Sequence, residues 1–71
     1  MSEVEKKGAA LMAALAAAEE DFDTALAAAK AAEAAGDEFS FATARQAAGE
    51  AYERVMGLSH DVASWASAHG A

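Results

Sequence analysis

A single apolar stripe, interrupted once, constrains the fold of this chain more than any other feature of its sequence. Its members recur in alternating steps of three and four residues through the first half of the chain and again through the second. They are Val4, Gly8, Leu11, Leu15, Ala18, Phe22, Ala25, Ala29 and Ala32, and then Phe41, Ala44, Ala48, Ala51, Val55, Leu58, Val62 and Trp65. This spacing keeps side chains on one face of an α-helix. Between the two runs, Gly36 can end one helix in a left-handed conformation and Asp37 can cap the next. The sequence therefore predicts an all-α fold, an antiparallel helical hairpin of two long helices over about 2–35 and 38–69, with its turn at 36–37.

The composition favours helices along the whole chain, which we expect to form a single helical domain over 1–71. Alanine, the residue with the highest helix propensity, supplies 24 of the 71 residues, and proline is absent. Ser2 followed by Glu5 fits a capping box at the start of the first helix. These local signals agree with the stripe.

A monomeric bundle of three or four shorter helices is the alternative that the sequence leaves open. Its breaks would lie near 21–23, where two aspartates interrupt the first half, and near 57–59 in the second. At the latter place Gly57 can stop a helix and Ser59 can cap a new one, and within one long helix we expect a kink or fray there.

The register of the hairpin can be tested by setting residues whose numbers sum to about 73 opposite each other. Each aromatic ring of the stripe then meets a small residue: Trp65 faces Gly8, Phe22 faces Ala51, and Phe41 faces Ala32. Large residues opposite small ones are what interdigitated packing requires. The two halves are therefore expected to approach each other closely.

Four apolar side chains lie beside the stripe rather than in it, namely Met12, Leu26, Tyr52 and Met56. A lone core in a chain below about 70 to 80 residues seldom supplies more than roughly 3 to 5 kcal/mol. No cysteine is present to add a disulfide. We therefore expect these four residues to mediate self-association, with two hairpins forming a homodimeric four-helix bundle.

The net charge of −7 comes from twelve acidic and five basic residues. Such a balance argues against direct nucleic-acid binding, because phosphate contacts need clustered lysine and arginine. The electrostatic complement of this chain is a basic protein surface. The candidate acidic patch for such a partner, placed by the hairpin register near the middle of the rod, comprises Glu19, Glu20, Asp21, Asp23, Glu50 and Glu53.

Ser59, His60 and Asp61 are the residue types of a hydrolytic triad, but they are consecutive. Neighbours on a helix point about 100° apart, so they cannot form the hydrogen bonds that link nucleophile, base and acid. Metal binding is not indicated either, because His60 and His69 are nine residues apart and neither belongs to a Glu-x-x-His pair. We expect no catalytic activity, no cofactor and no metal site.

The longest uncharged run, Gly8 to Ala18, is too short to span a membrane. It imitates the core of a signal peptide, but Glu3 and Glu5 neutralise the segment before it. The expected location is the cytoplasm. The function that follows from the sequence is a non-catalytic interaction or assembly protein acting through self-association and an acidic surface. The alternative is a small acidic inhibitor, of the kind made by phages or plasmids, that docks on a basic site of its target.

Overall fold

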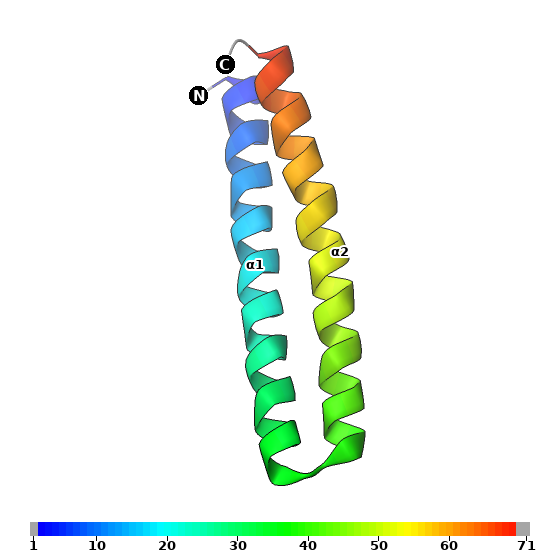
Figure 1. Cartoon of the computed structure of the whole chain (residues 1–71). Coiled ribbons are helices and arrows are strands. Elements are labelled where there is room, and N and C mark those ends of the chain that lie inside the picture. Colours follow the sequence, from blue (N-terminus) through cyan, green and yellow to red (C-terminus); the bar gives the residue numbers. More distant parts are fainter. Residues whose placement is uncertain (1, 70–71) are drawn as a thin grey trace.

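The computed structural model describes residues 2–69 and forms a hairpin of two antiparallel helices, α1 (Glu3–Ala35) and α2 (Glu38–Ala68) (Figure 1). The hairpin is a rod with extents of 50 × 18 × 14 Å. The first turns of α1 and the last turns of α2 lie side by side at one end, and the connecting turn lies at the other. The predicted all-α hairpin is therefore confirmed, with bounds that differ from the predicted ones by one residue at the outer ends.

The start of α1 is fixed by Ser2, which stands in an extended conformation before the first helical residue. Its hydroxyl oxygen accepts a hydrogen bond of 3.2 Å from the backbone N–H of Glu5. This bond satisfies one of the N–H groups that have no partner within the helix. Glu3 and Glu5 add negative charge where the helix dipole is positive. The predicted start of the first helix is confirmed.

The turn is a Schellman motif centred on Gly36. This residue has a φ of 73°, in the left-handed region that glycine adopts without steric cost. The N–H of Gly36 donates to the carbonyl of Glu33 at 3.1 Å, and the N–H of Asp37 donates to the carbonyl of Ala32 at 3.0 Å. These two bonds satisfy carbonyl groups that the end of α1 leaves free. Among residues 2–69 Gly36 is the one with a positive φ, and this conformation lets the chain reverse direction here.

Asp37 caps α2 with both of its carboxylate oxygens. Oδ1 accepts the backbone N–H of Ser40 at 3.0 Å, and Oδ2 accepts the hydroxyl of Ser40 at 2.7 Å. The hydroxyl bond, and then the backbone bond, hold the pKa of this carboxyl below its ordinary value. Both bonds favour the charged form, because only the carboxylate accepts them without competition from a proton.

We expect the hairpin to lose stability in acid through this cap. The folded pKa of Asp37 lies below the unfolded one, so its contribution is fully present above the unfolded value and is lost as the pH falls through the folded value. Thermal unfolding followed by circular dichroism between about pH 6 and pH 2 measures the loss. Asn caps equally well and does not titrate, so Asp37→Asn should show a smaller drop in Tm over this range. Identical profiles for the two proteins would contradict the prediction.

Both helices run without interruption through the places where the alternative fold required breaks. Residues 21–23 are helical within α1, and residues 57–59 are helical within α2. Helix α2 neither ends nor frays at Gly57, and the bundle of three or four short helices is wrong. A glycine inside a helix costs only about 1 kcal/mol relative to alanine, which the seam contacts of Leu58 next to it can offset.

The core of the hairpin consists of small residues. The helices meet along an interhelical seam formed by the predicted stripe, apart from Val4, which is exposed. The fully buried members of the seam are Gly8, Ala18, Ala25, Ala29, Ala32, Ala48 and Ala51. The larger seam residues are only half-buried: Leu11, Leu15, Phe22, Phe41, Val55, Leu58, Val62 and Trp65. Among the described residues no side chain larger than alanine is fully buried. Two helices can pack closely in this way, but they shield little apolar area from water.

The open end of the rod is closed by Trp65. A Cβ built on Gly8 would overlap the indole, at 2.6 Å from Cη2 and 2.8 Å from Cε2. The indole Nε1 donates a 3.2 Å hydrogen bond to the carbonyl of Val4, one turn earlier in α1. The predicted pairing of Trp65 with Gly8 is confirmed, whereas the hydrogen bond to Val4 was not foreseen.

Candidate interaction surface

The hairpin has two flanks, one on each side of the seam, and two contacts between the helices define them. On one flank Nη2 of Arg54 lies 3.7 Å from Oδ2 of Asp21. On the other the rings of Phe22 and Tyr52 lie 5.8 Å apart between centroids, tilted by 50°. We call the first the Arg54 side and the second the Tyr52 side.

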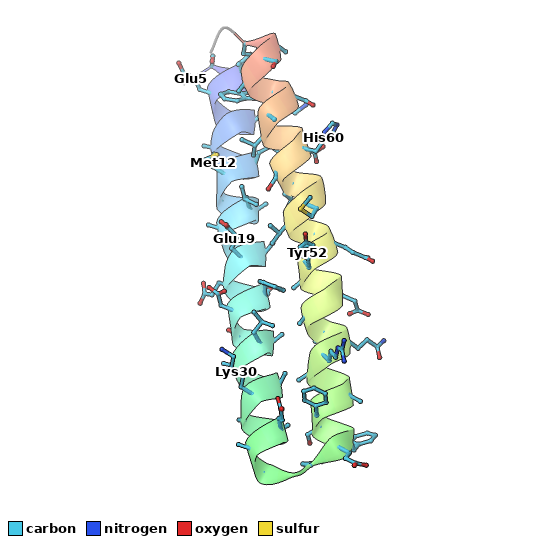
Figure 2. All side chains as sticks on the ribbon, in the orientation of Figure 1. Glu5, Met12, Glu19, Lys30, Tyr52 and His60 are labelled. Carbon is cyan, nitrogen blue, oxygen red and sulfur yellow. The ribbon has the colours of Figure 1, made fainter. Side chains whose placement is uncertain are left out.

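The Tyr52 side also carries the other residues expected to mediate self-association. Met12, Glu19 and Leu26 are seven residues apart and so form one column along α1. Glu19 precedes Asp21 by two residues, about 200° around the helix, which places this column across the seam from the Arg54 side. Figure 2 shows Met12 and Glu19 following one another along α1, with Tyr52 on α2 at about the height of Glu19.

All four of these apolar side chains are exposed. The exposed fractions are 54% for Met12, 39% for Leu26, 48% for Tyr52 and 56% for Met56, which follows Tyr52 by one helical turn. Only Tyr52 has a ring partner, Phe22, which covers one side of it. The structure thus brings the four residues to one flank of the rod, a grouping that the sequence shows only when both helices are placed together in the hairpin.

The acidic residues share one level of the rod but not one side of it. All six candidate carboxylates are exposed. The phase of each helix places Glu19 and Asp23 on the Tyr52 side, Asp21 and Glu50 on the Arg54 side, and Glu20 and Glu53 on the two outer edges, opposite the seam. They form an acidic belt, so one flat basic surface can reach only some of them at a time.

The three consecutive triad residue types lie on the continuous helix α2 and are exposed. Their side chains leave the helix about 100° apart, and Figure 2 shows His60 directed away from α1. A second set, Asp61, Ser64 and His69, lines an open groove of about 430 Å³ at the end of the rod. Within residues 2–69 no hydrogen bond joins any two of these three, and the His69 ring lies against Trp65 with centroids 5.7 Å apart. Neither set has the contacts that activate a nucleophile.

Residues 2–69 contain no group of three or more histidine, cysteine or acidic side chains placed to share a metal ion. Over the same residues, neither helix combines the length and the apolar character needed to cross a lipid bilayer.

Comparison with protein-family models, with curated proteins and with solved structures finds no match to this chain. The properties of the surface itself are therefore the basis for assigning a function.

Proposed function

We propose that this chain is a non-catalytic assembly protein that works by self-association, two hairpins packing their Tyr52 sides together into a four-helix bundle. The observation that carries the proposal is the grouping of Met12, Leu26, Tyr52 and Met56, all exposed, on one flank of a hairpin. Exposed apolar residues scattered singly are normal on a protein surface, whereas a contiguous group marks an interaction site.

The energetics of the hairpin point the same way. Burial of apolar area contributes about 25 cal/mol per Å². Fully buried side chains in this hairpin are no larger than alanine over the described residues, so the area that it removes from water is small for 71 residues. A second hairpin laid on the Tyr52 side would cover the four exposed side chains and the half-buried Phe22 beneath Tyr52. The core would then have two layers of helix pairs, which is the usual arrangement in stable bundles.

The cytoplasm is the proposed location of this assembly. A basic protein surface is the electrostatic complement of the acidic belt, but no observation selects one part of the belt for such a partner. The proposal therefore rests on self-association alone.

Sedimentation equilibrium of the double variant Met12→Asp, Met56→Asp tests the proposal. We expect the wild-type chain to sediment as a dimer at micromolar concentration and the variant to dissociate, with at least a 100-fold rise in Kd, because four charges would enter an apolar contact without partners.

Phe39→Asp is the matched control. Phe39 is the most exposed large apolar residue among residues 2–69, at 81%, but it lies in the first turn of α2 and is not in the column of Tyr52. Aspartate near a helix N-terminus is favourable, so this variant should stay folded and dimeric. A wild-type chain that is folded and monomeric at these concentrations would refute the proposed function.

A further inference from the structure

We infer that the two hairpins pair in antiparallel orientation, with the two-fold axis crossing the rods beside Glu19. This inference rests on the proposed function and specifies the partner as a second copy turned end for end. When two identical faces pack together, the two-fold axis lies in the plane between them, either along the rods or across them. An axis along the rods puts the turns of the two hairpins at the same end of the dimer, and an axis across the rods puts them at opposite ends.

The positions of the apolar side chains select the axis across the rods. Met12 and Leu26 are fourteen residues apart on α1, about 21 Å, and Glu19 is midway between them. On α2, Tyr52 lies beside Phe22, and Met56 lies one turn closer to the start of α1. The midpoint of this second pair is thus also at the level of residues 19–20.

An axis across the rods at this level makes the patch complementary to itself. Rotation about it places Met12 over Leu26 of the second copy and Tyr52 over Met56 of the second copy, so that each exposed apolar side chain meets another. An axis along the rods places α1 over α2 of the second copy, and each residue keeps its height along the rod. Tyr52 would then face the region between Glu19 and Asp23, where apolar area would be buried against carboxylates.

The cations of the Tyr52 side give an independent argument. They are Lys30, one turn beyond Leu26, and Arg45, which is in the column of Tyr52 and seven residues closer to the turn. Both are therefore near the level of residues 29–30, on different helices. With the axis along the rods, each Lys30 would lie opposite an Arg45, and like charges would meet twice.

With the axis across the rods, Lys30 moves to the level of residue 8 of the second copy, within about one helical turn of Glu5 there. Figure 2 shows Glu5 and Lys30 near opposite ends of α1, on the edge that also carries Met12. The like-charge contacts of this arrangement are Glu19 with its own copy at the axis, and Glu5 opposite Glu33 of the second copy, with Lys30 about one helical turn away. The placement of Lys30 nevertheless favours the antiparallel pair, because Lys30 lies near a carboxylate of the second copy there and opposite Arg45 in the parallel pair.

Interspin distances provide the test, and the absence of cysteine from the chain allows single labels to be placed without other changes. A nitroxide on Ala34→Cys sits fifteen residues from the axis, so its two copies should be about 45 Å apart in the antiparallel dimer. In the parallel dimer they would be within about 30 Å of each other. Glu20→Cys is the control, since it lies next to the axis and gives a distance below about 30 Å in both arrangements.

The substitution Lys30→Glu provides a second test, because it should change Kd in opposite directions for the antiparallel and the parallel dimer. In the antiparallel dimer it removes the cation near Glu5 of the second copy and should raise Kd by roughly 3- to 10-fold. In the parallel dimer it would pair with Arg45 and lower Kd. A short distance at Ala34→Cys in a confirmed dimer, or tighter binding by Lys30→Glu, would overturn the inference and leave the proposed function standing. A monomer by sedimentation would overturn both.

Discussion

The substitution Leu58→Asp is expected to leave the chain largely unfolded at 25 °C. Leu58 is a half-buried member of the seam, at the level of Leu15 on α1. The change removes the burial of a leucine side chain, which contributes about 2 kcal/mol, and puts a carboxylate without a partner against apolar neighbours. We estimate the total cost at about 3 kcal/mol or more, comparable to the whole stability that a core of this size supplies. Far-ultraviolet circular dichroism measures the loss of helix directly.

His60→Asp is the matched control, since it introduces the same side chain two residues further along the same helix. His60 is exposed, and it points away from α1. Replacing leucine by aspartate loses more helix propensity than replacing histidine does, but by no more than about 0.7 kcal/mol, so a larger difference between the two variants reports burial in the seam. We expect His60→Asp to retain the helical spectrum of the wild type. Its free energy of unfolding should lie within about 0.5 to 1 kcal/mol of the wild-type value. Equal loss of helix in the two variants would show that the seam is not the source of stability.

The sequence predicts the seam well because the pattern that defines it is local and continuous. Phe22 keeps its place in the three-four spacing although aspartates flank it, and the helix does run through this segment. The turn was predictable for the same reason, since glycine followed by a capping aspartate has few other uses between two helical runs.

Gly57 shows where local signals mislead. A glycine followed by a capping residue indicates a helix end when the segment is considered alone. Leu58 and Val62, however, both belong to the seam, and the contacts of a long seam outweigh the modest helix penalty of one glycine. The outcome depends on tertiary packing, which a window of a few residues does not contain.

The composition of the candidate surface is read directly from the sequence, whereas its grouping requires the hairpin as well. Met12, Leu26, Tyr52 and Met56 are recognisable in the sequence as apolar residues outside the stripe. Their position on a single flank follows from the phase of each helix once the two stripes face each other in antiparallel orientation, and the Arg54–Asp21 and Phe22–Tyr52 contacts mark the two flanks in the structure. The same helical phase spreads the acidic residues around the rod, although they cluster in the sequence.

Replacing glycine by alanine is expected to stabilise the hairpin at Gly57 and to destabilise it at Gly8. At Gly57 nothing lies within 4 Å of the position that a Cβ would take, and the residue is exposed in the interior of α2. Gly57→Ala should therefore stabilise the hairpin by roughly 0.5 to 1 kcal/mol, because alanine loses less backbone entropy on forming a helix. At Gly8 the same Cβ would overlap the Trp65 indole.

Gly8→Ala forces the indole away from α1, and this displacement outweighs the gain in helix propensity. Overpacking of this kind costs about 1 to 3 kcal/mol, and the hydrogen bond from Nε1 to the carbonyl of Val4 is lost as the ring moves. The net expectation is a loss of roughly 1 to 3 kcal/mol, measured by urea unfolding at a protein concentration where both variants have the same oligomeric state. In the background Trp65→Leu, which removes the ring, Gly8→Ala should cost much less or stabilise the chain. If Gly8→Ala stabilised the wild-type hairpin as Gly57→Ala does, the closure of the rod by Trp65 would be wrong, because a helix-interior glycine that gains from alanine cannot lie directly beneath an aromatic ring.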